Sequence, residues 1–424
     1  MTERRWLADI RPLRESPAYR RFWFGSAFSS VGNAMTNFAV ALQVYRLTGS
    51  SVAVGAVGLA TFVPALLFGV IGGALGDSLD RRRLVLVTQT CLMVISALFA
   101  LQAFLDLGQL WLLYVLVAIE ATLGAINGPA RRTFMPTLLP KEQIPAGSAL
   151  AMLSMHFSVI TGPLLAGLIV PLGGLKTCYL VDAITFVAAL YGVFRLPPMR
   201  PEGNQVRPGF AAIVDGFRFL GRSRVLTGVL LADVSATLLA MPIALFPAIN
   251  AERFGGSPRT LGLLSAGLAI GGVAGTVFSG PLRHVHRQGL GVLVAGAVWG
   301  AALTGFGAVH GLALTLAFLI VAGVADVCSV MMRSTIVQLA TPDAYRARIN
   351  AAELTVGAGV PQLGNFRAGL VAEGVGPGAS AGIGGIAAVI GAVLVGIACP
   401  ALVRYSTRDD VRDSDLSAAQ PVHQ

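Results

Sequence analysis

The sequence predicts an all-α integral membrane protein in which twelve transmembrane helices form two six-helix bundles. Three observations lead to this fold class. Of the 424 residues, 55% are hydrophobic and only 12% are charged, whereas about 25% of the residues in a soluble domain are charged. Apolar runs of roughly 20 residues, long enough to cross a bilayer, recur along the chain. The two halves of the sequence also resemble each other.

Composition excludes several classes of protein. A mean hydropathy of +0.73 is too high for a soluble fold, because polar residues must cover a surface that faces water. The two lysines, Lys141 and Lys176, do not follow glycine, so no phosphate-binding P-loop is present and an ATP-driven pump is excluded. The four cysteines and five histidines show no spacing typical of metal sites. We therefore expect no enzyme activity, no metal and no cofactor.

Twelve apolar runs are the expected transmembrane helices, and the charged residues gather between them. The net charge of +10 comes mainly from arginine clusters in alternate loops, which indicates membrane orientation and no nucleic-acid partner. The positive-inside rule places both termini in the cytoplasm. We expect a monomer in the cell (inner) membrane. The runs cover residues 22–46, 52–76, 84–105, 110–130, 145–171, 175–195, 225–250, 259–282, 289–308, 311–332, 349–372 and 379–403.

The runs divide into two repeats. A shift of 202 residues aligns Arg131 with Arg333 and Gly162 with Gly364, at the same helix ends in both halves. We expect an N-terminal bundle over residues 1–196 and a C-terminal bundle over residues 225–404. Between them, the proline-rich stretch 197–224 predicts a cytoplasmic linker that contains an amphipathic surface helix. The polar tail 405–424 is typical of disorder.

The most specific motif is the segment Gly73–Arg83, after the second run. Glycine there permits close packing at a helix end, the acid can cap or pair, and the arginines hold the loop in the cytoplasm. The segment resembles the signature loop of the major facilitator superfamily, Gly-x-Leu-x-Asp-Arg-x-Gly-Arg-Arg, although Ser78 and Asp80 depart from it. The matching residues are Gly73, Leu75, Asp77, Arg81 and Arg82. The resemblance implies a charge relay that switches conformation; a loop that only sets topology is the alternative.

A second motif lies in the fifth run, where Gly162 and Pro163 begin a Gly-Pro-Leu-Leu-Ala-Gly segment. Proline removes a backbone donor and the small residues admit a neighbouring helix, so the segment can bend and pack closely. It resembles an element of antiporters in the same superfamily, which implies a part in conformational switching. Simple close packing is the alternative interpretation.

Further segments are similar to the enterobactin exporter family and to related drug and macrolide efflux proteins. The similarity extends over essentially the whole chain, and Glu120 stands where that exporter family has an acidic residue in its fourth helix. The segments that carry it are Trp6–Leu13, Pro17–Arg20, Gly216–Leu220 and Thr341–Asn350.

Acidic residues inside apolar runs are the candidate sites of mechanism. A charge at bilayer depth costs roughly 2.5–3.5 kcal/mol, so each acid must face protein, water or a proton. A carboxyl group withdrawn from water, with a second carboxylate near it, can bind and release a proton near neutral pH. Five acids occupy such positions: Glu120, Asp182, Asp233, Asp326 and Glu353. In the superfamily, the helices that carry Glu120, Asp233 and Asp326 line the central cavity, so the resemblance implies that these three couple protons to transport; hydrogen bonds between helices and contact with cavity water are the alternatives.

Two asparagines are candidate substrate contacts. Asn33 and Asn37 are four residues apart and therefore share a helix face, near the middle of the first run. Glu120 is a further candidate contact, and interhelical hydrogen bonding is the alternative role of the asparagines. From the family resemblance together with the buried acids, we expect a transporter that exports a small organic molecule, first of all a siderophore, by alternating access with proton antiport. Multidrug or macrolide efflux, a lipid flippase and a non-transporting membrane scaffold are the alternatives.

Overall fold

The computed structural model describes residues 9–199, 214–215, 218–221, 223–280, 282, 285–342 and 345–406. Within these ranges every regular element is a helix, which confirms the all-α fold class. The helices before residue 200 are α1 (Arg11–Glu15), α2 (Pro17–Thr48), α3 (Ser51–Ser78), α4 (Arg81–Phe104), α5 (Leu110–Arg132), α6 (Phe134–Leu138), η1 (Lys141–Gln143) and α7 (Ile144–Phe194). Those after it are α9 (Arg224–Ala240), η2 (Ile243–Leu245), α10 (Phe246–Phe254), α11 (Pro258–Val277), α12 (Gln288–Ala308), α13 (Leu312–Ala340), α14 (Arg346–Val375), α15 (Pro377–Ala398) and α16 (Pro400–Arg404).

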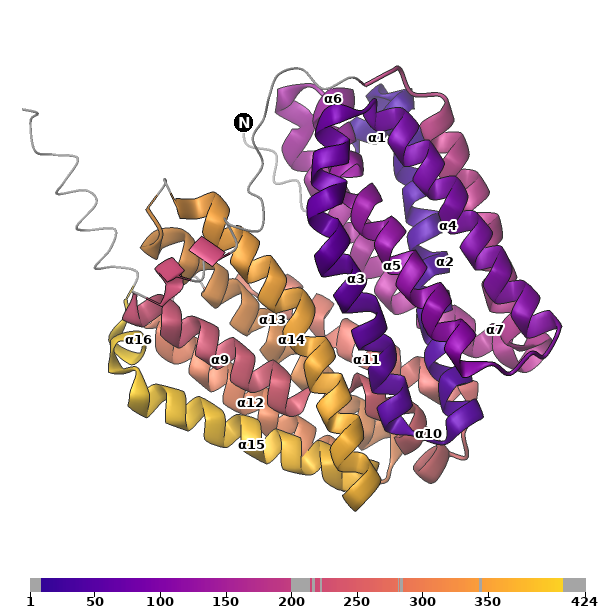
Figure 1. Ribbon diagram of the computed structural model, residues 1–424. Helices are drawn as coiled ribbons and strands as arrows, with labels where there is room; N and C mark the ends of the chain where they lie inside the picture. Colours follow the sequence, from indigo (N-terminus) through magenta and orange to yellow (C-terminus); the bar gives the residue numbers. More distant parts are fainter. Residues whose placement is uncertain are drawn as a thin grey trace, which may run out of the picture. The chain divides into compact units, whose positions relative to one another are not determined.

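The chain forms two compact units (Figure 1). The first consists of Met1–Arg207 and Asn250–Ala266, and the second of Pro208–Ile249 and Gly267–Gln424. In the first unit, α7 packs along α2 and α4, while α5 packs against α3 and α4. In the second unit, α12 lies against α13 and α15, and α9 contacts α14 and α15. The boundaries predicted from the sequence for two bundles and a linker remain a prediction.

Corresponding glycines bring corresponding helices together in the two units. A Cβ on Gly162 would collide with the Cβ of Ala34, so α7 directly abuts α2. A Cβ on Gly364, its partner in the predicted repeat, would collide with the carbonyl oxygen of Thr237, so α14 abuts α9 in the same way. Side chains larger than hydrogen would force these helices apart. The repeat seen in the sequence therefore corresponds to a repeated helix contact.

The helices follow the predicted apolar runs, with two differences in continuity. The fifth and sixth runs form one helix, α7, which kinks where Gly174 adopts a φ of 77°. The seventh run, predicted as one helix over 225–250, is broken between α9 and η2 because Pro242 has no backbone N–H to continue the helix. Among the described residues, nine helices are long and apolar enough to cross a membrane by length and composition. The total of twelve remains a prediction.

The break after α9 is closed by polar side chains of α14. The guanidinium of Arg367 donates a hydrogen bond to the carbonyl oxygen of Leu239, near the end of α9. The side-chain oxygen of Asn365 accepts a hydrogen bond from the backbone N–H of Ala244 at 3.1 Å. Backbone groups freed inside a membrane need such partners, because no water is available there. Helix α14 therefore stabilises an interrupted neighbour.

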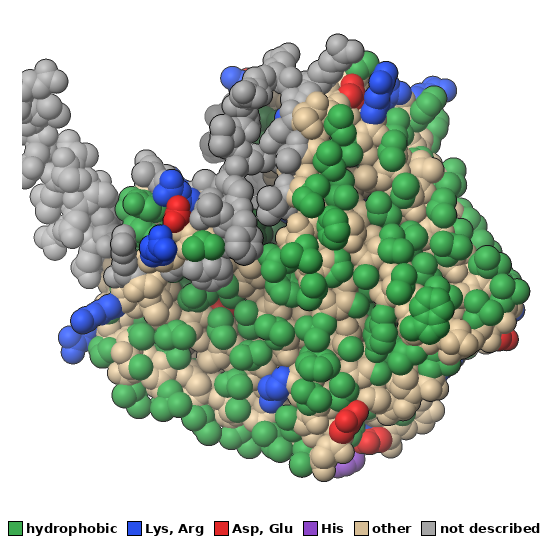
Figure 2. Space-filling model, viewed as in Figure 1, with side chains coloured by type: hydrophobic (Ala, Val, Ile, Leu, Met, Phe, Trp, Pro, Cys, Tyr) green, Lys and Arg blue, Asp and Glu red, His purple; other side chains and the backbone are tan. Residues whose placement is uncertain are grey.

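Large apolar side chains cover much of the outer surface of the helices. Figure 2 shows hydrophobic side chains spread over the visible face, with only scattered charged side chains among them. Leu172 is 83% exposed, and Trp111 and Ile397 are similarly open. A soluble monomer rarely exposes apolar patches on this scale. The surface is that of a protein dissolved in lipid.

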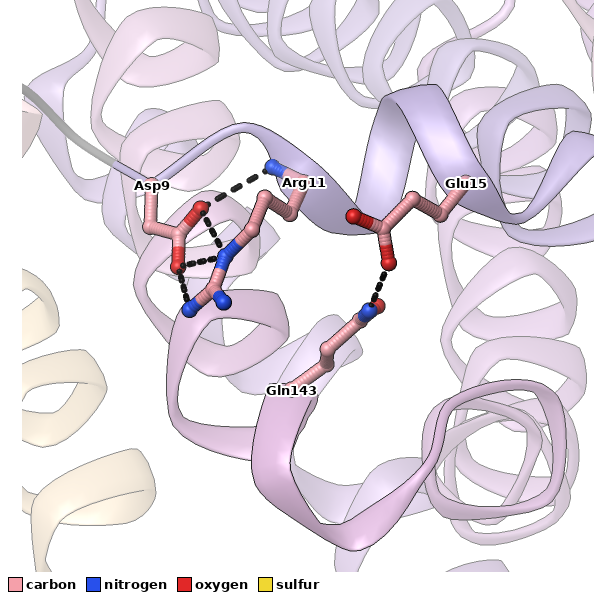
Figure 3. Close-up of polar contacts among 4 residues, drawn as sticks. All are labelled: Asp9, Arg11, Glu15 and Gln143. Carbon is pink, nitrogen blue, oxygen red and sulfur yellow. Dashed lines mark hydrogen bonds and ion pairs between the residues drawn. The ribbon is translucent and has the colours of Figure 1, made fainter.

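Polar contacts join the first described residues to the start of α7. Asp9 accepts hydrogen bonds from Arg11, and Gln143 donates to Glu15 at 2.5 Å (Figure 3).

Of the predicted linker, residues 200–213, 216, 217 and 222 lie outside the described residues, and so does the tail from 407 onward. The described part of the predicted amphipathic helix contains Leu220, which is buried in the core of the second unit beside Leu226.

Candidate functional site

A line of polar side chains on α2 connects the helices of the first unit. The side-chain amide of Asn33 donates a hydrogen bond to Glu120 of α5 at 2.5 Å, and Asn37 donates to the oxygen of Asn33 at 3.1 Å. The structure thus brings together the three residues predicted as substrate contacts. Asn37 is exposed, while Asn33 and Glu120 are partly buried. Glu120 can accept hydrogen bonds or bind a proton, and Asn33 fixes the position of its carboxyl group.

The same helix reaches two further polar centres. Thr36 of α2 donates to Asp182 of α7 at 2.8 Å. Seven residues further along, Gln43 exchanges hydrogen bonds of 3.0 Å with Gln102 of α4 and accepts one of 2.7 Å from the hydroxyl of Tyr179. Each centre is buried, so the hydrogen bonds fix how α2, α4 and α7 pack.

The second unit contains a cavity of about 630 Å³ with charged groups in an apolar wall. Asp233 of α9 and Arg333 of α13 line it and form an ion pair, with side chains only 13% and 17% exposed. Glu353 of α14 lines the same cavity and interacts electrostatically with both members of the pair. The wall also includes Leu226, Val229, Leu230, Val330, Val337, Leu354 and Val356. A ligand in this cavity meets apolar surface together with one cation and two carboxyl groups.

Asp326, the third predicted proton-coupling acid, lies near the ion pair of the second unit. It lies on α13 two helical turns before Arg333 and is partly buried. Its carboxyl group interacts electrostatically with Arg333 and Asp233. It is not among the residues that line the described cavity. Within the second unit, Asp326 can thus influence the ion pair without direct contact with a ligand there.

The predicted signature loop is mostly helical. Helix α3 continues through Gly73 and Asp77 to Ser78, and α4 begins at Arg81. Asp80 caps α4, because its carboxylate accepts a hydrogen bond of 3.0 Å from the backbone N–H of Arg83. The side chain of Asp77 lies outside the described part of the structure.

The two predicted switch arginines, Arg81 and Arg82, donate hydrogen bonds to backbone carbonyl groups near the connection between α3 and α4. Arg81 donates to the carbonyl oxygen of Gly76 at 3.1 Å. Arg82 donates to the carbonyl oxygen of Phe194, at the end of α7, and its guanidinium lies 5.8 Å from the centre of the Phe194 ring. Gly73 is buried. These contacts all lie within the first unit and hold α3, α4 and α7 in register.

The motif in α7 lies at a crowded helix contact. Beyond the contact of Gly162 with α2, the carbonyl oxygen of Pro163 would lie 2.6 Å from a Cβ on Gly262 of α11. A Cβ on Gly167 would lie 2.7 Å from the carbonyl oxygen of Pro258. Three glycines thus permit α7 to touch two helices through their backbones. The predicted close packing is present.

Sequence reasoning named Asp182 and Glu353 as acids in apolar runs without assigning them a role, and it assigned none to Arg333. Asp182 is recognisable as an acid in an apolar run, but nothing in the sequence shows that hydroxyl groups from two other helices meet it. Arg333 marks the end of a run, and its pairing with Asp233 joins helices about 100 residues apart. Glu353 is also an acid in an apolar run, but its place in the cavity depends on how α14 packs. The signal available for all three is a charge within or beside an apolar run.

The fold and these polar centres define an integral membrane transporter. Solved transporter structures share its architecture: the nucleoside transporter NupG superposes with a TM-score of 0.72 at 14% identity, over 92% of this chain and 100% of that one. A bacterial homologue of the iron transporter ferroportin, in an inward-facing state, gives a TM-score of 0.64 at 18% identity over 89% and 98% of the two chains. These likenesses show the fold of the major facilitator superfamily.

The chain belongs to the transmembrane secretion effector family of that superfamily, whose family model matches residues 8–421. It is similar to the enterobactin exporter EntS of Citrobacter koseri, with 27% identity over 97% of this chain and 99% of that protein. It is also similar to EntS of Escherichia coli O1:K1, with 28% identity over 82% and 84% of the two chains. The predicted superfamily is therefore confirmed, and the protein is a transporter rather than an enzyme.

Proposed function

We propose that this protein exports a siderophore across the cell membrane by alternating access, in exchange for protons. The similarity to enterobactin exporters covers nearly the full length of both chains, which supports export of a molecule of that class. The proposal includes cytoplasmic termini, from the arginine distribution, and a monomeric transporter.

The cavity of the second unit is the observation that carries the proposal. Its volume of about 630 Å³ falls within the range of roughly 300–1,000 Å³ that is usual for small-molecule sites. Siderophores present many oxygen atoms and hydroxyl groups on an organic framework. Arg333 can donate hydrogen bonds to such oxygens, Asp233 and Glu353 can accept them from hydroxyl groups, and the apolar wall can contact the framework.

In the proposed mechanism, a proton and the substrate compete for the same carboxyl groups, and this competition couples proton entry to substrate export. An ionised Asp233 accepts strong, charge-assisted hydrogen bonds from substrate hydroxyl groups on both oxygens, whereas a protonated one accepts only weaker, neutral ones, mainly on its carbonyl oxygen. Binding of a proton therefore favours release of substrate, which is the relation that an antiporter needs. Glu120, which accepts a hydrogen bond from Asn33, can likewise bind either a proton or a substrate hydroxyl group in the first unit. We assign proton coupling to Glu120 and Asp233, with Asp326 acting on the ion pair electrostatically.

The proposed conformational switch consists of close helix contacts in the first unit. Asp77, Arg81 and Arg82 lie where α3 and α4 meet the end of α7, and Gly162 and Pro163 lie where α7 touches other helices. In the proposed cycle these contacts change between the two conformations. This assignment rests on the motifs and their location.

A deletion strain distinguishes the substrate classes. Under iron limitation, the strain should secrete less siderophore into the medium, and a plasmid copy of the gene should restore secretion. Its susceptibility to a panel of drugs and macrolides should equal that of the parent. Unchanged secretion together with raised susceptibility would replace siderophore export by multidrug efflux.

Proteoliposomes test the coupling residues. With an imposed pH gradient, Glu120→Gln and Asp233→Asn should each bind substrate but lose most gradient-dependent transport. Glu142→Gln, a change to an exposed acid outside the predicted apolar runs, is the control and should behave as the wild type. Undiminished gradient dependence in both site variants would remove these residues from the coupling mechanism.

A further inference from the structure

A carboxyl group outside the proposed substrate cavity is buried in the first unit. Asp182 has no exposed surface and lies in the second half of α7, where this helix packs against α2 and α4. One carboxyl oxygen, Oδ2, accepts two hydrogen bonds: one of 2.8 Å from the hydroxyl of Thr36 and one of 2.7 Å from that of Ser96. Three helices therefore meet at a single oxygen atom.

The other oxygen of Asp182 has no hydrogen-bond partner, although it is completely buried. Helix α2 closes directly over it, because a Cβ on Gly32 would lie only 2.5 Å from Oδ1. This approach leaves no space for a water molecule between them. Within the described residues, no Lys, Arg or His forms an ion pair with Asp182. An ionised Asp182 would thus be a fully buried anion without a counter-charge, with one oxygen that accepts no hydrogen bond.

Such an anion is costly in a membrane interior, because a buried charge needs a partner or solvent. A neutral carboxylic acid fits the geometry better. Its carbonyl oxygen is Oδ2, which accepts both hydroxyl hydrogen bonds, and its proton is on Oδ1, the oxygen that lacks a donor. The arrangement is therefore one that holds a proton.

Glu120 is the titratable group that this proton can influence. The two carboxyl groups interact electrostatically. They are also linked through one helix, because Asn33 contacts Glu120 and Thr36, three residues later, contacts Asp182. On its own helix, Asp182 lies one turn from Cys178 and Tyr179, and the hydroxyl of Thr185 donates to its backbone carbonyl oxygen at 2.7 Å. The facing residues of α2 and α4 are the uncharged Thr36 and Ser96. Two nearby carboxyl groups ionise as a coupled pair, so a charge on one opposes a charge on the other.

We propose that Asp182 is a second proton-binding residue of the first unit, which carries a proton in this conformation and shares it with Glu120 during transport. The proposal rests on the proposed proton antiport, and it deepens that function by naming a residue that cannot touch the substrate. Asp182 is a positioning and proton-holding group, and Glu120 is the group open to a ligand. Together they provide a site with room for one or two protons.

Infrared spectroscopy of the purified transporter in lipid tests the protonation. At neutral pH, the spectrum of the wild type minus that of Asp182→Asn should contain the C=O stretching band of a protonated carboxylic acid. In Ser96→Ala, which removes one donor to Oδ2, that band should persist and move to higher frequency. Carboxylate bands in place of the acid band would overturn the proposal. If Asp182→Asn does not fold, Ser96→Ala alone still tests the protonation, because an absent shift also contradicts it.

Proteoliposomes test the role in transport. In Asp182→Asn, the pH profile of gradient-driven transport should move to lower pH by about one unit. In the wild type, once Asp182 has passed its proton on, its carboxylate favours protonation of Glu120, and the variant lacks that charge. Glu142→Gln should keep the wild-type profile. An unchanged profile in Asp182→Asn, with a gradient-dependent wild type, would make Asp182 a permanently neutral packing residue and refute the inference alone. A wild type that ignores the gradient would instead refute the proposed antiport.

Discussion

The ion pair between Asp233 and Arg333 makes a quantitative prediction about the second unit. Asp233→Asn leaves the guanidinium of Arg333 in the cavity wall without a negatively charged partner. Arg333→Met leaves the carboxylate of Asp233 without a positively charged partner. The double variant removes both charges. Each single variant should therefore destabilise the protein far more than the double variant does, because an unpaired charge in a poorly solvated place is costlier than no charge.

The size of the effect follows from burial. The two side chains are 13% and 17% exposed, so solvent screening is weak. Removing one partner of a buried ion pair typically costs about 3–5 kcal/mol. The lower end, about 3 kcal/mol, applies to Asp233→Asn, because Glu353 lines the same cavity and can compensate part of the charge on Arg333. The double variant should recover about 2 kcal/mol of that loss.

Unfolding in mixed micelles of a mild and a denaturing detergent measures these free energies. The matched control is Asp215→Asn, which removes exposed ion pairs with Arg218 and, at 4.0 Å, with Arg348 in the same unit. The pair with Arg218 spans 3.6 Å, and the three side chains are 43–67% exposed, so the loss of both pairs should change little. If Asp233→Asn costs no more than Asp215→Asn, or if the two single effects simply add in the double variant, the pair does not stabilise this unit.

Two further predictions concern helix packing. Gly364→Ala should lower the free energy of unfolding by about 1–3 kcal/mol, because the new methyl group collides with the carbonyl oxygen of Thr237; Gly374→Ala on the same helix, with no atom within 4 Å, should be neutral or stabilising, and equal effects in the detergent assay would contradict the close contact. Tyr179→Phe should cost about 1 kcal/mol, because Gln43 loses a buried donor; the exposed Tyr191→Phe should show no change in the same assay, and a neutral Tyr179→Phe would show that the buried network contributes nothing.

Composition and helix length were sufficient to predict the fold class. A chain with this few charges can cover itself only with lipid, and the lipid-facing residues of the structure, such as Leu172 and Trp111, are those of the apolar runs. The repeat was also readable, because Gly162 and Gly364 mark equivalent helix contacts. Continuity was harder to predict: a proline such as Pro242 can bend or end a helix, and which occurs depends on whether neighbours such as Arg367 satisfy the freed backbone.

The candidate site could be predicted only one helix at a time. The position of Glu120 in an apolar run marks it as a candidate, and its contact with Asn33 joins two residues that the sequence marks separately. The pairing of Asp233 with Arg333 required knowledge of how α9 packs near α13. The hydrogen bonds to Asp182 come from two hydroxyl groups of other helices, and nothing in the sequence marks those hydroxyl groups as its partners. Side-chain chemistry was visible in the sequence, whereas partners between helices were not.

Simultaneous measurement of substrate and proton fluxes tests proton-coupled export most directly. The purified protein is reconstituted in vesicles that contain a pH-sensitive dye, and a siderophore is added on the side that corresponds to the cytoplasm. We expect siderophore movement across the membrane to be accompanied by proton movement in the opposite direction, and a protonophore to abolish accumulation. Siderophore accumulation that continues without any proton movement, or proton movement that no siderophore elicits, would contradict this coupling.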